Sequence, residues 1–298
     1  MDEQTPQPAG LANGVSLLIP AYNEAGAISA TITQARAMLE QTLLPGTPWE
    51  IVVIDDGSAD DTAAIARQTG VTVIAHRQNL GYGAALKSGL RRSTHPVIII
   101  TDADGTYPIS EVPQMLPHLG PTDMVVGSRT GAEVHIPAIR KPAKWVLKMT
   151  AQFLAGRAIP DLNSGLRIFY RKDALRFMSL YPSGFSFTTT ITLAYLSSDL
   201  LIHYHPINYH PRTGKSKIRP IRDTKNLFLT VVRSILFFNP LRVCLPIGSA
   251  LLILAALIAI FPRDDHGRIY DGTITILVVS ALQIIIVGFL ADILARLR

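Results

Sequence analysis

The chain has 298 residues, enough for one large domain or two ordinary ones with a buried core. Its formal net charge is +6, and its single cysteine, Cys244, excludes an intrachain disulfide, which agrees with a reducing compartment. The mean hydropathy of +0.28 is high for a soluble enzyme with 17% charged residues, so apolar sequence must be concentrated in one part of the chain.

The first 14 residues, MDEQTPQPAGLANG, are polar and proline-rich. They contain no apolar core of the kind that a signal peptide needs. We therefore expect residues 1–14 to form a flexible tail.

From residue 15 to about residue 126, short apolar segments alternate with amphipathic ones. The expected strands cover residues 15–19, 50–54, 71–75, 97–100 and 123–127, and the expected helices cover residues 24–40, 60–69, 81–92 and 110–118. Nearly all-apolar strands that alternate with helices are typical of a parallel sheet covered on both faces. The pattern predicts a doubly wound, mostly parallel α/β domain, which we place over residues 15–221.

Polar or acidic clusters follow four consecutive strands of this predicted sheet. They are PAYNE at 20–24, DDGS at 55–58, HRQNLG at 76–81 and DAD at 102–104. A turn explains any one of them, because Asp, Gly and Pro gather where strands end. Ligands of doubly wound sheets bind outside the carboxyl ends of the strands, so four clusters on one rim favour a binding site.

Asp102 and Asp104 lie directly after the apolar run at 97–100. Carboxylate oxygens are preferred ligands of hard divalent cations, which often bind together with phosphate. We expect Mg²⁺ or Mn²⁺ at Asp102 or Asp104, holding a nucleotide diphosphate and stabilising the charge on the departing nucleoside diphosphate. A G-x-G-x-x-G motif after the first strand and a P-loop are both missing from the sequence, which disfavours those two nucleotide sites.

Four motifs in order, PAYNE (20–24), DDGSADDT (55–62), NLGYGAALKSG (79–89) and DADGTYP (102–108), resemble the inverting family 2 glycosyltransferases, which have a GT-A fold. The resemblance continues through GSR (127–129), DLNSGLRIFYR (161–171) and PRTGKSKI (211–218) to the C-terminal segment. This combination is similar to the polyprenyl-phosphate glycosyltransferases, relatives of dolichyl-phosphate mannose synthase. It covers the chain from about residue 15 to about residue 295.

The resemblance implies a nucleotide-sugar site built from these motifs. Its residues would be Pro20, Tyr22, Asn23, Glu24, Asp55, Asp56, Gly81, Lys87, Asp102, Ala103 and Asp104. Asp55 or Asp56 would contact the base, and Asp102 and Asp104 would serve the metal and catalysis. Lys87 is also compatible with a solvated lysine on a helix surface. Thr106 stands where some relatives have Gln, which leaves that contact open.

The residues expected to bind the acceptor follow from the negative charge of a lipid phosphate. A lipid monophosphate carries about 1.5 to 2 negative charges at pH 7, so it can attack the sugar without a residue to deprotonate it. It needs cations to bring two anionic reactants together. The resemblance implies acceptor-phosphate contacts from Arg129, Arg140, Ser164, Arg212, Lys215 and Lys217. A solvated or lipid-facing basic loop is the alternative for the last three.

Asp161, in the segment DLNSG, is the third catalytic candidate. The resemblance implies a carboxylate near the reacting centre, acting as a base or as an orienting group. A structural turn is the alternative.

Three histidines, His203, His205 and His210, lie in the segment IHYHPINYH. Their alternation with apolar residues is typical of an edge strand. Neither a cysteine nor a suitably spaced carboxylate accompanies them in this segment, so the spacing disfavours a zinc site.

Two uncharged apolar runs, residues 243–262 and 273–291, each have about the 20 residues that a membrane-spanning helix needs. Neither has a polar face, so we expect a transmembrane hairpin over residues 243–295. The amphipathic segments 143–156 and 222–242 are candidate interfacial helices, although the first is equally compatible with packing on the sheet. Basic residues flank both ends of the hairpin, which indicates a cytoplasmic catalytic domain.

The sequence therefore predicts an integral membrane enzyme that transfers one sugar, with inversion, from GDP-mannose or a UDP-hexose to polyprenyl or dolichyl phosphate at the cytoplasmic face. Its expected partners are the nucleotide sugar, the lipid phosphate and the membrane. Nucleic acid is not expected, since anionic lipid suits the basic charge better beside two spans. The sequence leaves open whether the chain forms a homo-oligomer.

Two alternatives remain at this point. A processive polysaccharide synthase shares the fold, but the Gln-x-x-Arg-Trp motif of such enzymes is missing from the sequence. A membrane-tethered, inactive nucleotide-sugar-binding scaffold is disfavoured by the intact acidic pair and the basic run.

Overall fold

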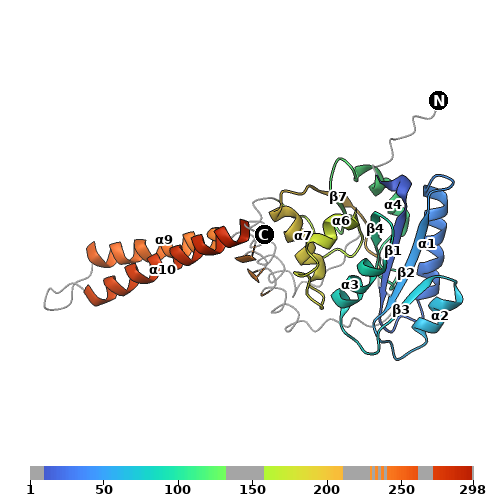
Figure 1. Cartoon of the computed structure of the whole chain (residues 1–298), viewed down its shortest axis with the longest axis horizontal. Coiled ribbons are helices and arrows are strands. Elements are labelled where there is room, and N and C mark those ends of the chain that lie inside the picture. Colours follow the sequence, from blue (N-terminus) through green and yellow to red (C-terminus); the bar gives the residue numbers. More distant parts are fainter. Residues whose placement is uncertain are drawn as a thin grey trace.

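The computed structural model describes residues 10–131, 158–210, 240–260 and 271–296, together with positions 229, 232–233 and 236–237. These residues form an α/β domain and a pair of long C-terminal helices that projects from it (Figure 1). Residues 1–9 of the expected tail lie outside the described residues. Leu11, within the same predicted tail, is buried in a short 3₁₀ turn, Leu11–Asn13, so the ordered fold begins before residue 15.

The α/β domain contains seven strands and six α-helices among its described residues. The strands are β1 (Val15–Ala21), β2 (Trp49–Asp55), β3 (Thr72–Ala75), β4 (Val97–Ile100), β5 (Met124–Ser128), β6 (Arg167–Tyr170) and β7 (Ile202–Pro206). The helices are α1 (Ile28–Thr42), α2 (Thr62–Gln68), α3 (Tyr82–Arg92), α4 (Val112–Met115), α6 (Arg171–Arg176) and α7 (Phe187–Ser197). Two 3₁₀ turns, η2 (Ile109–Glu111) and η3 (Leu116–His118), flank α4.

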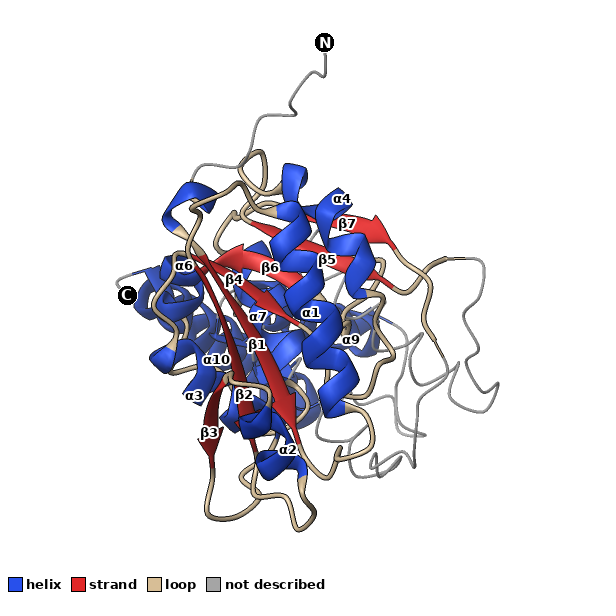
Figure 2. Cartoon of the chain, turned by 90° about the vertical axis from the view of Figure 1, so that its right-hand side faces the viewer, coloured by secondary structure: helices blue, strands red, loops and turns tan. Residues whose placement is uncertain are grey.

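The strands form one sheet in the order β3-β2-β1-β4-β6-β5-β7 (Figure 2). β6 runs antiparallel to β4 and β5, and the other pairings are parallel. The predicted α/β class with a mostly parallel sheet is confirmed, whereas the reversed strand β6 was not predicted. The edge strand expected in the histidine segment is β7, which pairs with β5 at the end of the sheet.

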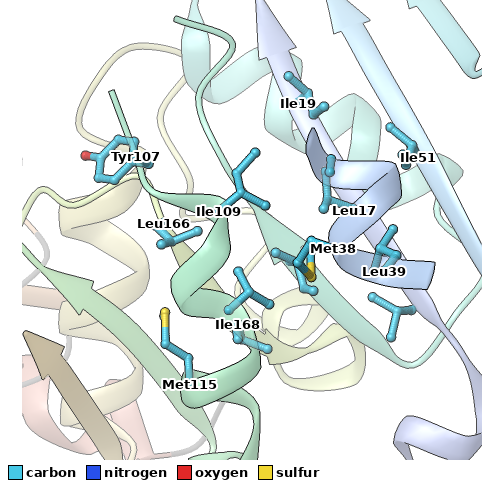
Figure 3. Packing of buried hydrophobic residues seen from close by; sticks show 14 of the residues in the cluster. Leu17, Ile19, Met38, Leu39, Ile51, Tyr107, Ile109, Met115, Leu166 and Ile168 are labelled. Atoms are coloured by element: carbon cyan, nitrogen blue, oxygen red, sulfur yellow. The ribbon is translucent and has the colours of Figure 1, made fainter. Parts of the chain in front are cut away.

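Side chains alternate between the two faces of the sheet, and each face is covered by helices. Leu17 and Ile19 of β1 pack with α1, α2 and α4, while Leu18 between them packs with α3, α6 and α7. Figure 3 shows the first of these clusters, where Met38 and Leu39 of α1 lie against the sheet. Because both faces are covered, the strands in the middle of the sheet are buried along their whole length.

The two C-terminal helices, α9 (Leu241–Ile260) and α10 (Asp271–Arg296), lie side by side (Figure 1). They approach through small residues, because Gly248 packs against Ile285, and Gly288 against Cys244. Their large apolar side chains point outward, with Ile253 at 60% and Ile276 at 67% exposure. Both helices are long and apolar enough to be candidate membrane spans, in agreement with the prediction.

The hairpin also touches the α/β domain. Val243, near the start of α9, packs on a small apolar cluster formed by Ile159, Leu162, Leu193 and Leu196. The predicted interfacial helix at 143–156 lies outside the described residues, and so does most of the one at 222–242.

Candidate active site

The first two polar clusters meet at the carboxyl ends of β1 and β2. The backbone N–H of Asn23 donates to Ser58 Oγ at 2.8 Å, and the backbone N–H of Ala59 donates to Asn23 Oδ1 at 2.8 Å. The N–H of Glu24 donates to Thr62 Oγ1 at 2.8 Å. Asn23 has a φ of 51°, in the left-handed region that Asn tolerates better than most residues. The turn that carries Tyr22 and Glu24, just after Pro20 in β1, is therefore fixed against the loop after β2.

Asp55 ends β2 with only 4% of its surface exposed. Its Oδ2 accepts a long hydrogen bond of 3.4 Å from the N–H of Ser58, and its Oδ1 has no hydrogen-bond partner among the described residues. A buried carboxylate oxygen without a donor is costly, and such groups deserve an explanation. Asp55 Oδ1 is therefore suited to accept an N–H group from a ligand.

Both carboxylate oxygens of Asp56 have hydrogen-bond partners within the fold. Its Oδ1 accepts from the N–H of Leu80 at 3.0 Å and lies 2.7 Å from His76 Nδ1, while its Oδ2 accepts from the N–H of Gly81 at 2.7 Å. His76 in turn lies 2.9 Å from Ser88 Oγ. Asp56 thus anchors the start of α3 and shapes the rim.

The glycines at the start of α3 allow a close approach to another segment. A Cβ at Gly81, where φ is +102°, would overlap the carbonyl oxygen of Ser183, and one at Gly83 would overlap that of Pro182. Lys87 Nζ donates to the carbonyl oxygen of Tyr181 at 3.1 Å. Gly81 and Gly83 leave room for this contact and Lys87 adds a hydrogen bond, so that α3 is held against residues 181–184.

The paired acids follow β4 and are oriented by neutral hydroxyl groups. Tyr82 Oη donates to Asp102 Oδ1 at 2.9 Å, and Thr106 Oγ1 donates to Asp104 Oδ1 at 2.7 Å. The carbonyl oxygen of Ala103 accepts from Thr31 Oγ1 at 3.1 Å, which ties the acidic loop to α1. Because Tyr82 and Thr106 are neutral, these two hydrogen bonds orient the carboxylates without adding a positive charge beside them.

Burial, reinforced by the charge of Asp102, raises the pKa of Tyr82 well above its ordinary value. The phenol therefore stays protonated and remains a donor to Asp102 at any physiological pH. The backbone of Gly165 packs close to the same carboxylate, and its N–H donates to Tyr107 Oη at 2.7 Å. The acidic loop is thus held from two sides.

Arg129 and Asp161 form a bidentate ion pair. Arg129 Nε lies 2.7 Å from Asp161 Oδ2, and Nη2 lies 2.9 Å from Oδ1. Burial alone would raise the pKa of Asp161, but the hydrogen bonds and charge of Arg129 outweigh it and lower the pKa to about 2. The Arg129 guanidinium lies 5.4 Å from the ring centre of Tyr209, which itself packs edge-on against Tyr107. The structure thus brings Arg129 and Asp161 together as one unit.

The loop that carries Asp161 is fixed by a buried arginine. Arg167 of β6 has no exposed surface and donates to the carbonyl oxygens of Ser164 at 2.8 Å and Leu162 at 3.2 Å. It also donates to Thr192 Oγ1 at 2.8 Å, on α7. The Ser164 hydroxyl is buried and donates to the carbonyl oxygen of Gly127. The predicted acceptor residues Arg140, Arg212, Lys215 and Lys217 lie outside the described residues.

Several site residues were missed by sequence reasoning, although two lie inside quoted motifs. Tyr82 belongs to NLGYG and Tyr107 to DADGTYP, but a tyrosine in a motif does not reveal which acid its hydroxyl will meet. His76, in the cluster HRQNLG, and Tyr209, in the segment IHYHPINYH, gave no indication of their partners either. Their contacts with Asp56 and Arg129 arise only once distant strand ends are brought together.

The fold resembles that of a solved glycosyl-transferring enzyme. The structure is similar to glucosyl-3-phosphoglycerate synthase from Mycobacterium tuberculosis, solved with Mn²⁺, UDP-glucose and phosphoglyceric acid, with a TM-score of 0.57 and 20% identity. The match covers 75% of this chain and 80% of that one. A mixed α/β sheet with this arrangement and an acidic pair beyond β4 defines a GT-A-like fold.

The model of glycosyl transferase family 2 matches residues 16–177, which is more than half of the chain. The protein belongs to this family and is a glycosyltransferase, as predicted.

Two relatives come from Haloferax volcanii. The low-salt glycan biosynthesis hexosyltransferase Agl6 is 32% identical over 72% of this chain and 52% of its own length. A dolichyl-phosphate hexose transferase is 27% identical over 74% of this chain and 92% of its own length. The chain therefore spans about half of the first relative and most of the second.

Proposed function

We propose that this glycosyltransferase moves one sugar, with inversion, from a nucleotide diphosphate sugar to polyprenyl phosphate. The observation that carries the proposal is that an acidic rim and the Arg129–Asp161 pair belong to a domain on which Val243, in the first of two candidate membrane spans, packs. The similarity to a protein named dolichyl-phosphate hexose transferase supports a lipid phosphate as the acceptor.

The donor nucleotide would lie across the carboxyl ends of β1 and β2. Asp55 Oδ1 is buried and lacks a partner among the described residues, so it is the group we assign to an N–H of the base. Pro20, at the end of β1, and Tyr22, Asn23 and Glu24, in the turn after it, would line the same pocket. Asp56 and Gly81 would act indirectly, by fixing the start of α3 at the edge of the pocket.

The carboxylates of Asp102 and Asp104 fit a hard divalent cation, Mg²⁺ or Mn²⁺, because they offer oxygen ligands oriented by neutral hydroxyls. When bound, the cation supplies positive charge that stabilises the departing nucleoside diphosphate. Tyr82 and Thr106 would hold the two carboxylates in position for it. Ala103 would contribute through its backbone, and Lys87 would steady α3 beside the site.

In the proposed reaction, a phosphate oxygen of the lipid forms a bond to the anomeric carbon while the bond from that carbon to the diphosphate oxygen breaks. Attack from the opposite face inverts the configuration. The acceptor is already anionic, so no residue has to remove a proton. Asp161 is therefore assigned to orient Arg129, whose remaining guanidinium N–H groups would face the acceptor phosphate. Ser164 would support this loop through Gly127.

Arg140, Arg212, Lys215 and Lys217 would add positive charge around the acceptor, an assignment that rests on the sequence alone. Basic residues at both ends of the hairpin support a cytoplasmic orientation of the catalytic domain. In that orientation the site would meet the phosphate of a polyprenyl lipid at the membrane surface.

A transfer assay on the full chain in detergent tests the proposal. Purified protein is mixed with Mn²⁺, undecaprenyl or dolichyl phosphate, and radiolabelled GDP-mannose, UDP-glucose or another UDP-hexose in turn. We expect label to enter the organic phase with one donor and only when the lipid phosphate is present. Label in a long polymer would instead indicate a processive synthase, and no label with any donor would indicate an inactive scaffold; either result overturns the proposal.

A further inference from the structure

A second group of metal-ligating side chains lies three strands away from β4, at the edge of the sheet. His203 and His205 project from the same face of β7, because side chains two residues apart in a strand share a face. His118, at the end of η3, packs on that face. The ligand nitrogens of these three histidines all lie within 4.8 Å of one another.

A carboxylate lies next to one member of the group. Glu111 Oε2, on η2, lies 3.4 Å from His205 Nε2. The three histidines are only partly buried, so an ion could reach them from solvent. Neither a nucleotide nor an acceptor role is assigned to any of these four residues, and the ring contacts among them need an explanation of their own.

The nature of the ligands selects the metal. Imidazole nitrogens favour Zn²⁺ and its neighbours in the transition series, whereas Mg²⁺ and Mn²⁺ prefer oxygen ligands. Three histidines and one carboxylate make a four-coordinate set of the kind that zinc accepts. We propose that His118, His203, His205 and Glu111 form a Zn²⁺ site that is separate from the carboxylate pair of the active site.

Zinc binding requires a small rearrangement. The rings of His118 and His203 are stacked, with centroids 3.8 Å apart and an interplanar angle of 14°. Lone pairs of ring nitrogens lie in the ring plane, so two parallel rings cannot both point at one ion. Tetrahedral zinc, with Zn–N near 2.0 to 2.1 Å, needs nitrogens about 3.3 to 3.4 Å apart. In the proposed zinc-bound form, one of the two rings would therefore rotate out of the stack.

The site would clamp the edge strand. A bound ion would join β7 to η3 and η2, which belong to a segment distant in sequence. The chain after β7 continues into Tyr209, beside Arg129, and into His210, whose N–H donates to the carbonyl oxygen of Thr106 at 3.0 Å. A clamp on β7 would therefore steady the segment that reaches the active site.

The spacing within residues 202–210 disfavours zinc because that segment contains only two of the three histidines of the group. His210 is not part of the group, and His118 comes from the turn after α4. The ligand set becomes visible only when the sheet places β7 beside that turn.

Isothermal titration with ZnCl₂ tests the proposal on the full, untagged chain in detergent. Excess Mg²⁺ is present to occupy the carboxylate pair. We expect one zinc per chain with micromolar or tighter affinity, and at least a tenfold weaker affinity in His118→Gln and in His203→Asn. His210→Ala, in the same segment but outside the group, should bind like the wild type. Asp104→Asn should also retain zinc binding, which separates this site from the active site.

Three further measurements guard against misfolded variants. Far-ultraviolet circular dichroism and thermal unfolding without zinc must match the wild type before a lost affinity is interpreted. X-ray absorption of the zinc-loaded wild type should show imidazole ligands, with no need for any variant. Absence of zinc binding by the wild type, unchanged affinity in folded His118→Gln and His203→Asn, or a zinc spectrum with oxygen ligands alone would each overturn the proposal.

Discussion

Replacing Gly165 with alanine would move a proposed metal ligand without removing any charged group. A Cβ at this position would lie 2.8 Å from Asp102 Oδ1, 2.9 Å from Oδ2 and 3.0 Å from Cγ. Contacts become ordinary only at 3.4 Å, so the carboxylate must retreat by about 0.6 Å. The N–H of Gly165 still reaches Tyr107, because the substitution leaves the backbone donor in place.

A shift of this size exceeds what a metal site tolerates. Ligand distances are expected to hold to within about 0.2 Å of their preferred values. Disturbing the support of a metal ligand typically costs about 10- to 100-fold in metal affinity or activity. We therefore expect the Mn²⁺ concentration for half-maximal transfer to rise by about 10- to 100-fold in Gly165→Ala.

The assay is the Mn²⁺ dependence of sugar transfer into the organic phase. Thermal unfolding is measured alongside, and overpacking of this kind should cost about 1 to 3 kcal/mol of stability, leaving the protein folded at assay temperature. Gly26→Ala is the matched control, because a Cβ there meets nothing within 4 Å. A Gly165→Ala enzyme with the Mn²⁺ requirement and maximal rate of the wild type would refute the assignment of Asp102 to the metal.

Four other outcomes are expected. Asp104→Asn should abolish transfer while the protein stays folded and membrane-bound; near-normal turnover would contradict its metal role. Thr106→Val should lower the transfer rate about tenfold by releasing Asp104, whereas Thr106→Ser should retain it, and equal rates for the two would remove the positioning role. The folded-state pKa of Asp161 lies below its ordinary 3.8, at about 2, so its pairing with Arg129 stabilises the fold above about pH 4 and is lost as the pH falls toward 2. That contribution to the free energy of unfolding is about 2 kcal/mol. In Asp161→Asn the free energy of unfolding should therefore fall less between about pH 4 and pH 2 than in the wild type. The same fall in both proteins would argue against the ion pair. Lys217→Ala should raise the apparent KM for the lipid with little change in that for the donor, and an unaltered lipid KM would count against its acceptor role.

The alternating apolar pattern was sufficient to predict most of the sheet, because Val97–Ile100 and its neighbours are buried on both faces. β6 escaped prediction because it is short and begins with an arginine. Arg167 can be buried only because carbonyl oxygens and a threonine hydroxyl from other segments satisfy its guanidinium. The local sequence around Arg167 does not indicate which groups will satisfy its guanidinium.

The convergence of the strand ends was predictable from topology, since the polar clusters all followed strands that were expected to be parallel. The different roles of neighbouring residues within a cluster could not be predicted in this way. Asp55 and Asp56 are adjacent and are the same residue type, yet one has an oxygen without a partner in the described structure and the other accepts hydrogen bonds from the loop before α3. The pairing of Arg129 with Asp161 likewise depends on where β5 and the loop before β6 lie in the finished fold.

Val243, near the start of α9, packs on the apolar cluster that contains Leu162, and Leu162 is the immediate neighbour of Asp161. If α9 and α10 cross a bilayer, as we propose, a change in the tilt of the hairpin would press on the loop that carries Asp161. Membrane thickness would then alter the transfer rate. Nanodiscs made from short-chain and long-chain lipids would expose this dependence as a difference in rate at equal substrate concentrations.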